Sequence, residues 1–450
     1  MYNRGANDMA GTQQQVSSPS GLLARLAEAR YATDKLFKIP LPDALFDRPI
    51  PERHRIIFYV GHLEAFDWNL LGSYGYGLKP FDPEFDRLFA FGIDPTDGGL
   101  PSDQPSDWPS LEEVHGYNGR VRQELDSRLR DEPLTDRDNR LSKFGVYVNV
   151  ALEHRLMHAE TLAYMFHQLP LHRKVKQPAT NVPAAPISGR RMINIPPGTA
   201  TLGLRRSGGG FGWDNEFEVN VVNVPAFAID EYKVTNGEFV KFVREGGYET
   251  RSLWSDSGWE WIKREGIGHP SFWVPYGGSW NYRTMFDEVP LPLDWPAYVS
   301  HEEAEAYARW AGKQLPTETQ FHRAAYGTRH GEEADYPWGS GAPEKNHGNF
   351  DFTNWNPTPV QAHPAGRSSF GVADLVGNGW EWTSTVFEPF KGFQPFPFYR
   401  GYSANFFDGK HYVMKGGSSR TAACMLRRSF RNWFQSHYQY VYSGFRCVSS

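Results

Sequence analysis

The 450-residue chain contains very little cysteine, with Cys424 and Cys447 as its only thiols. Two thiols are too few to crosslink a secreted chain of this size, so the sequence predicts a reducing compartment. No apolar run approaches the roughly 20 residues that span a bilayer. The polar stretch from Met1 to Ser20 also lacks the apolar core of a signal peptide. We therefore expect a cytoplasmic protein with no membrane partner.

The chain also lacks an excess of basic charge. Its 47 Lys and Arg residues are outnumbered by 52 Asp and Glu residues, which gives a formal net charge of −5. Proteins that bind nucleic acids or acidic membranes generally present a basic field. We therefore expect small-molecule substrates and no nucleic-acid partner, and the composition leaves the oligomeric state open.

Aromatic residues and glycine are abundant, by contrast. The chain is 40% hydrophobic and 15% aromatic, with 15 Trp and 44 Gly, which is ample for packed cores. Its length predicts two or three domains. Apolar residues recur at three- and four-residue spacing in four early segments, which predicts an up-down helical bundle: Leu22 to Phe37, Glu52 to Leu71, Leu111 to Arg130 and Lys143 to Leu169.

Composition also suggests where the domains begin and end. Residues 1–20 are rich in Gln, Ser and Gly and predict a disordered tail. Residues 21–172 hold the helical segments, including a long Pro/Asp/Gly-rich stretch at 79–109 that predicts a loop. A Pro/Ala/Ser-rich stretch at 173–190 predicts the linker. Residues 191–450 form the second domain, in which short apolar runs predict two strands and two short helices: 192–195, 218–224, 300–311 and 318–325.

The first candidate site is a set of histidines in the helical domain. His154 and His158 lie four residues apart in an apolar-periodic segment, so both imidazoles leave one face of a helix. His62 lies in the middle of another predicted helix, which a bundle would allow to face this pair. Three imidazoles leave positions open on an octahedral iron(II), although zinc fits the same ligands. Glu153 and Glu160 are off the histidine face by helical phase, so we expect them outside the ligand set.

The second domain carries a recognisable set of motifs. Its central segment resembles the core signature of the formylglycine-generating-enzyme (sulfatase-modifying factor) family, and further segments agree in order: Gly371 to Thr383 around Trp380-Glu381-Trp382, Glu231 to Phe239, Pro296 to Glu318, Gly416-Gly417-Ser418 and Gly444-Phe445-Arg446. The resemblance implies a C-type-lectin-like fold that is rich in coil. The predicted class is thus α+β with two domains.

A histidine-bearing bundle ahead of such a domain is similar to the ergothioneine-type sulfoxide synthases (hercynine oxygenases), whose bundle is DinB-like. That resemblance implies that His62, His154 and His158 bind iron(II). It also implies that Tyr402 is the catalytic tyrosine that supplies a proton, with Tyr399 as its substitute. The resemblance further implies that the trimethylammonium group of hercynine is enclosed by Asn432, Trp433 and Phe434. It also implies that Arg120 and Arg122 bind the carboxylates of the sulfur donor.

The chain departs from the families that it resembles at three points: the cysteine pair, the residues between the paired histidines, and the segment Arg53 to Tyr59 before His62. Formylglycine generation needs a cysteine pair after the Gly-Gly-Ser turn, and Cys424 is single and out of register, so that chemistry should be absent. We expect Cys424 and Cys447 to be small buried apolar residues. Between the paired histidines stand Arg155-Leu156-Met157, where the mycobacterial type carries a glutamine. The chain therefore resembles a separate branch.

The sequence thus predicts an iron(II)- and O2-dependent enzyme that joins a thiol to the imidazole C2 of hercynine, giving a sulfoxide. Cysteine, γ-glutamylcysteine and a selenium donor all remain open as the donor. One alternative is a 5-histidylcysteine sulfoxide synthase acting on unmethylated histidine. Another is a non-catalytic lectin-like binding module with a structural metal.

Overall fold

A computed structural model of the chain describes residues 19–91, 101–131, 140–178, 191–208 and 210–449. The chain divides into two compact units, a helical unit of residues Met1–Lys176 and a mixed unit of residues Gln177–Ser450. Most of the predicted tail and most of the predicted linker lie outside the described residues. Among the described helices, none has the length and apolarity needed to cross a membrane.

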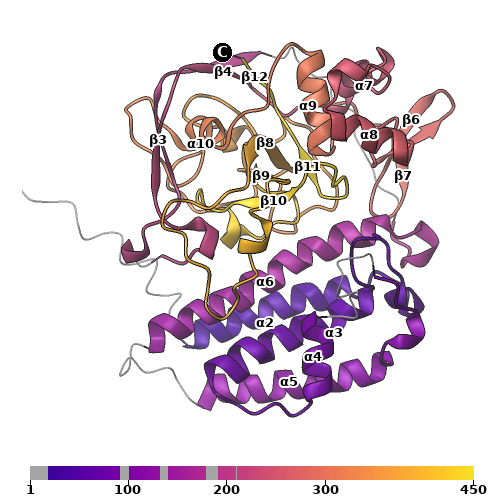
Figure 1. The fold of residues 1–450 in the computed structure, drawn as a ribbon, viewed down its shortest axis with the longest axis vertical. Coiled ribbons are helices and arrows are strands. Elements are labelled where there is room, and N and C mark those ends of the chain that lie inside the picture. The colour runs from indigo at the N-terminus through magenta and orange to yellow at the C-terminus, as the bar shows by residue number, and fades with distance from the viewer. Residues whose placement is uncertain (1–18, 92–100, 132–139, 179–190, 209, 450) are drawn as a thin grey trace, which may run out of the picture. The chain divides into compact units, whose positions relative to one another are not determined.

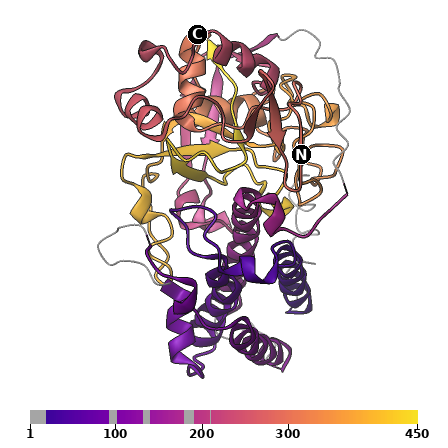
Figure 2. The same ribbon diagram turned by 90° about the vertical axis from the view of Figure 1, so that its right-hand side faces the viewer.

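The helical unit is built from helices that run side by side (Figures 1 and 2). Its helices are α2 (Pro19–Leu36), α3 (Ile56–Asp67), α4 (Pro83–Phe91), α5 (Leu111–Asp131) and α6 (Arg140–Gln168), and α3 continues into a π-helical segment, Trp68–Gly75. Helix α2 packs against α5 and α6, and α3 packs against α4, α5 and α6. The four predicted helices are confirmed, because apolar side chains at helical spacing are what such packing requires.

Helix α4 corrects the prediction of a continuous loop at 79–109. Asp82 starts this helix, since its Oδ1 accepts a hydrogen bond from the backbone N–H of Phe85 at 3.1 Å. Pro83 takes the first helical position, where no N–H is needed. Phe89 then buries its ring completely. Proline and aspartate here mark a helix start rather than a loop, and residues 92–100 of the predicted loop lie outside the described part.

The mixed unit contains short strands, short helices and much coil (Figure 1). Its largest sheet has the order β10-β9-β8-β11, and the other sheets are β1-β4-β12, β5-β6-β7 and β2-β3. The strands are β1 (Met192–Ile195), β2 (Gly198–Leu202), β3 (Asn220–Val224), β4 (Phe227–Asp230), β5 (Trp273–Tyr276), β6 (Ser279–Arg283), β7 (Glu288–Pro290), β8 (Trp380–Val386), β9 (His411–Lys415), β10 (Asn432–Gln435), β11 (Ser443–Gly444) and β12 (Val448–Ser449).

The helices of the mixed unit are α7 (Asn236–Arg244), α8 (Asp256–Glu265), α9 (His301–Trp310) and α10 (Glu318–Tyr326). Helix α9 begins with a capping box, in which Ser300 and Glu303 satisfy each other's backbone N–H groups. Helix α10 begins in the same way with Thr317 and Gln320. The predicted strands at 192–195 and 218–224 and the predicted helices at 300–311 and 318–325 are all present, with ends shifted by up to two residues.

The signature segments of the mixed unit meet in its interior. Glu381, between Trp380 and Trp382, accepts two hydrogen bonds from Arg446 at 2.6 and 2.7 Å. Lys233 lies 3.3 Å from the same carboxylate. All three side chains are fully buried, and a buried charge is tolerated when it is paired in this way. Residues from three motifs far apart in sequence thus build one structural centre.

Candidate metal centre and aromatic site

The structure brings the three predicted histidines of the helical unit together. His62 comes from α3, and His154 and His158 come from consecutive turns of α6. One ring nitrogen from each lies within 4.8 Å of the others. The ring centroids are 5.2 Å apart for His62 and His154, 4.9 Å for His62 and His158, and 4.5 Å for His154 and His158. Three imidazole nitrogens at this spacing can share one metal ion.

The surroundings keep all three imidazoles neutral, which is the form that binds metals. Burial lowers the pKa of His62 to about 4, although its hydrogen bond to Phe89 acts in the opposite direction. Burial, and next the neighbouring imidazoles, hold the pKa of His154 and of His158 well below the usual value. At neutral pH each ring therefore presents a lone pair without first losing a proton.

The backbone of α4 orients His62. Its Nδ1 lies 2.6 Å from the carbonyl oxygen of Phe89. A carbonyl can only accept, so Nδ1–H is the donor and Nε2 carries the lone pair. Gly61 makes this approach possible, because a Cβ at this position would lie 2.5 Å from the Phe89 ring. Sequence reasoning missed both Gly61 and Phe89, although the Asp82-Pro83 helix start could have revealed α4.

Aromatic side chains hold the imidazoles in place. Phe66 stacks on His154 with ring centroids 3.5 Å apart, and Phe58 stacks on His62 at 4.7 Å. Within the described residues, Nδ1 of His158 is buried and makes no hydrogen bond. A buried ring nitrogen of this kind is costly unless it finds a partner, and a metal ion is one suitable partner.

The carboxylates next to these histidines are not part of the cluster. Glu153 and Glu160 are buried, and the group of possible metal ligands among the described residues contains only the three histidines. The set therefore offers three neutral nitrogen donors, and a metal ion held by them would keep further positions for other ligands. This donor set fits iron(II) and also fits zinc.

The two arginines predicted to bind the sulfur donor lie on α5. Arg122 binds two carboxylates, with hydrogen bonds of 2.7 and 2.8 Å to Asp34 and of 2.7 and 3.0 Å to Glu64. Arg120 is exposed, and its guanidinium lies 4.2 Å from the centroid of the Phe81 ring. Arg122 is thus engaged in the helical core, whereas Arg120 faces solvent. Their role toward a substrate stays a prediction.

Tyr402 of the mixed unit is held among aromatic rings. Its ring stacks on Trp213 at 3.9 Å with an interplanar angle of 25°, and it meets Trp433 edge-on at 5.4 Å. Tyr399 is a neighbour at 5.6 Å. Burial raises the pKa of Tyr399 to about 12. The structure thus brings Tyr402 together with Trp433, and Trp213 is a contact that sequence reasoning missed.

Trp433 and Phe434 make different contacts, because neighbouring residues of β10 point to opposite faces of the sheet. Trp433 stacks on Phe387 at 4.2 Å, whereas Phe434 stacks on Tyr438 at 4.9 Å. Asn432 accepts a hydrogen bond at 2.9 Å from the backbone N–H of Trp433. Trp433 is thus in ring contact with Tyr402, whereas Phe434 stacks on Tyr438.

The cysteine expectation is half wrong. Cys447 is buried as predicted, but Cys424 is exposed. It lies in a single 3-10 turn, Ala423–Met425, whose only buried residue is Met425. In this turn Met425 takes the buried position and Cys424 points to solvent.

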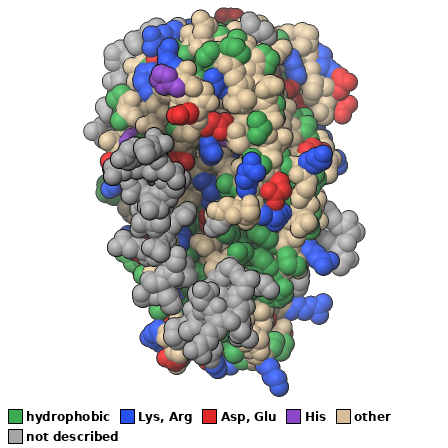
Figure 3. Space-filling model, turned by 90° about the vertical axis from the view of Figure 1, so that its left-hand side faces the viewer, with side chains coloured by type: hydrophobic (Ala, Val, Ile, Leu, Met, Phe, Trp, Pro, Cys, Tyr) green, Lys and Arg blue, Asp and Glu red, His purple; other side chains and the backbone are tan. Residues whose placement is uncertain are grey.

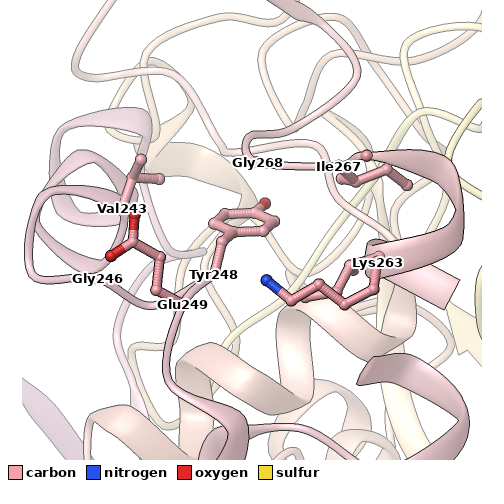
Figure 4. A pocket seen from close by; sticks show the side chains of 9 residues that line it. Val243, Gly246, Tyr248, Glu249, Lys263, Ile267 and Gly268 are labelled. Atoms are coloured by element: carbon pink, nitrogen blue, oxygen red, sulfur yellow. The ribbon is translucent and has the colours of Figure 1, made fainter. Parts of the chain in front are cut away.

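The structure shows two further surface features. The described residues form a pocket of about 360 Å³ lined by residues around the C-terminal ends of α7 and α8, among them Tyr248, Glu249 and Lys263 (Figure 4). None of the predicted site residues lines it. On the face shown in Figure 3, acidic and basic side chains are interspersed, as expected for a chain of small net charge.

Comparison with known proteins agrees with this arrangement. Residues 178–450 match the family described as sulfatase-modifying factor enzyme 1-like domain. The chain is 41% identical over 236 residues to a hercynine oxygenase of Mycobacterium tuberculosis, and this alignment covers 52% of this chain and 55% of the relative. It is 34% identical over 380 residues to a hercynine oxygenase of Mycolicibacterium smegmatis, covering 81% of this chain and 83% of the relative.

A eukaryotic relative extends the match along the chain. Ergothioneine biosynthesis protein 1 of Neurospora crassa is 30% identical over 513 aligned positions, which cover 94% of this chain and 57% of the relative. The alignments with the Mycobacterium tuberculosis and Neurospora crassa proteins thus span little more than half of those relatives. Together with the histidine cluster, these matches show that the chain belongs to the hercynine oxygenase family and carries a sulfatase-modifying-factor domain in its second half.

Proposed function

We propose that this chain is a non-haem iron(II), O2-dependent sulfoxide synthase that joins the sulfur of a thiol to the imidazole C2 of hercynine. The cluster of three neutral imidazoles, in a chain of this family, is the observation that carries the proposal. The reaction balances without a further reductant. A thiol S–H and the C2–H supply two hydrogens, and O2 supplies the sulfoxide oxygen and the oxygen of one water.

The histidines fit iron(II) because they offer three neutral nitrogen donors. When bound, iron(II) supplies the redox chemistry that couples reduction of O2 to formation of the carbon–sulfur bond. The protein's part is to orient the ligands. The hydrogen bond from His62 to Phe89 and the stacking of Phe66 on His154 hold two of the rings, and such supporting contacts tune a metal site.

Tyr402 is the proposed proton donor. A phenol O–H can deliver a proton and hydrogen-bond to a reacting oxygen. Stacking on Trp213 and edge contact with Trp433 restrict the orientation of its ring. Trp433 in turn offers an aromatic face for the trimethylammonium group of hercynine, which attracts such a face by about 0.5–2 kcal/mol.

Arg120 is the better placed of the two arginines for binding a carboxylate of the sulfur donor. Its side chain is exposed, whereas Arg122 already binds Asp34 and Glu64. A guanidinium with open donors can take a carboxylate in the two-point geometry that makes such pairs strong. The proposal leaves the donor open among cysteine, γ-glutamylcysteine and a selenium compound.

Product analysis tests the proposal. The purified chain is loaded with iron(II) without air and then given O2, one candidate donor and either hercynine or histidine. Oxygen consumption with formation of the C2 sulfoxide of hercynine is the expected result, and mass spectrometry identifies the donor that works. A product on C5 of histidine would favour the 5-histidylcysteine reaction. No oxygen consumption by an iron-loaded protein with any of the donors would overturn the proposal.

A further inference from the structure

A buried arginine ties together the two helices that carry the histidine cluster. Arg155 directly follows His154 on α6, so its side chain leaves the helix ~100° away from that imidazole. On α3, Glu64 and Asp67 follow His62 by two and five residues. Each helix therefore carries imidazole on one face. On a second face it carries charged side chains that can pair with those of the other helix.

Arg155 makes several short polar contacts. One terminal nitrogen lies 2.7 Å from Oδ2 of Asp67, 3.0 Å from Oε2 of Glu64 and 2.9 Å from the carbonyl oxygen of Leu63. The other terminal nitrogen lies 3.3 Å from Oγ1 of Thr33 on α2. The side chain is 1% exposed. A planar guanidinium with this many partners admits one orientation, so it specifies the register of α6 against α3.

Other arginines complete the charge network, and among the described residues they form no hydrogen bond or ion pair with α6. Arg30 of α2 binds Asp126 of α5 at 2.6 Å and lies 3.8 Å from Glu64. Arg122 of α5 binds the other oxygen of Glu64. Loss of any of these guanidinium groups removes part of the charge compensation of the buried carboxylates and destabilises the unit. Loss of Arg155 additionally removes the link between α3 and α6.

We propose that Arg155 is a positioning residue of the histidine cluster: by binding Asp67, Glu64 and the Leu63 carbonyl, it sets the distance between His62 of α3 and the His154/His158 pair of α6. The inference concerns the metal-binding geometry and rests on the proposed metal site, but not on the proposed reaction. This role also explains why an arginine stands between the two histidines: its side chain pairs with the buried carboxylates of α3.

Cobalt(II) is a suitable probe, because its visible absorption reports the coordination geometry and its titration reports affinity. Apo full-length protein is titrated anaerobically as wild type, Arg155→Met and Arg30→Met, and the Tm of each is measured without metal. Arg30→Met is the matched control, since Arg30 is 6% exposed in the same network but, among the described residues, forms no hydrogen bond or ion pair with α6. The affinity of Arg155→Met should fall about 10- to 100-fold with a changed spectrum.

The control should lose thermal stability but keep the wild-type spectrum and affinity. An unchanged affinity and spectrum in folded Arg155→Met would overturn the inference, as would an equal loss in both variants, which would reflect destabilisation alone. If Arg155→Met does not fold, Asp67→Asn, which keeps the side-chain shape, must give the changed spectrum instead. A wild-type protein that binds no cobalt would reject the metal site itself, and with it the proposed function.

Discussion

The Nδ1 atom of His62 lies 2.6 Å from the carbonyl oxygen of Phe89, at the end of a helix in a stretch whose composition suggests a loop. This hydrogen bond selects the tautomer in which Nε2 of His62 carries the lone pair. Supporting contacts of this kind commonly decide whether a set of histidines binds a metal. Helix α4 is therefore part of the candidate metal centre.

Removal of any histidine should abolish iron binding. His158→Ala leaves two nitrogen donors, which is too few for this type of centre, so bound iron and turnover should both be largely lost while the helical content remains. Iron analysis and circular dichroism measure the two quantities. His172→Ala, on a histidine outside the cluster, is the control and should keep full iron. Full iron in folded His158→Ala would show that the ligand set is wrong.

Gly61 should not tolerate a larger residue. A Cβ at this position would lie 2.5 Å from the Phe89 ring, and Phe89 is fully buried, so α4 must shift and the Phe89 carbonyl must move from His62. Gly61→Val should weaken metal binding about tenfold or more and lower the Tm. Gly116→Val is a control on α5, because a Cβ there has open space around it. Equal metal affinity in both variants would contradict the role of α4.

Tyr402→Phe tests the proton donor. The change keeps the ring and its stacking on Trp213 but removes the O–H, so coupling should give way to oxidation of the thiol alone to a sulfinic acid. The measurement is the ratio of sulfoxide to sulfinic acid at saturating substrates. Tyr399→Phe is the matched control and should keep the wild-type ratio. A shift in Tyr399→Phe but not in Tyr402→Phe would move the role to Tyr399.

Trp433 and Phe434 should differ in their effect on hercynine binding. Trp433 meets Tyr402 edge-on, so Trp433→Leu should raise the KM for hercynine, by roughly 2- to 30-fold for the loss of one cation–π contact. Phe434→Leu should leave this KM within about twofold, since Phe434 stacks on Tyr438 instead. Steady-state kinetics with the thiol saturating distinguish the two. A larger effect from Phe434→Leu would place the ammonium group on the other face of β10.

His301 predicts acid sensitivity of the mixed unit. Burial lowers its pKa from 6.5 to about 3. Between these values the unfolded chain binds a proton that the folded chain does not, so the free energy of unfolding falls as the pH falls below 6.5. Above pH 6.5 this effect on the free energy of unfolding is absent. Below pH 6.5 the free energy of unfolding falls by about 1.4 kcal/mol per pH unit.

Denaturant unfolding at pH 7 and pH 5 measures this effect. Wild type should lose about 2 kcal/mol more than His301→Gln, whose amide does not titrate. The glutamine can still donate to the Thr383 carbonyl, which lies 3.1 Å from Nε2 of the histidine. The same loss in both proteins would assign the acid sensitivity to other groups.

The sequence by itself determined the features that depend on local backbone geometry. Helical periodicity placed His154 and His158 on one face of α6, because residues four apart always share a face. The short helices predicted at 300–311 and 318–325 are local features of the same kind, and each begins with a capping box formed by residues three apart. The ordered motifs around Glu381 identified the domain, and their buried contacts with Lys233 and Arg446 explain why these residues occur together.

Only the tertiary structure decided the contacts between residues far apart in sequence. Local spacing does not specify that Phe89 meets His62, that Arg155 turns toward Asp67, or that Cys424 stays exposed. Local spacing predicts different contacts for Trp433 and Phe434 only once β10 is known to be a strand, because neighbouring side chains of a strand point to opposite faces. Such contacts depend on how whole elements pack, and packing selects among many partners that are equivalent in the sequence.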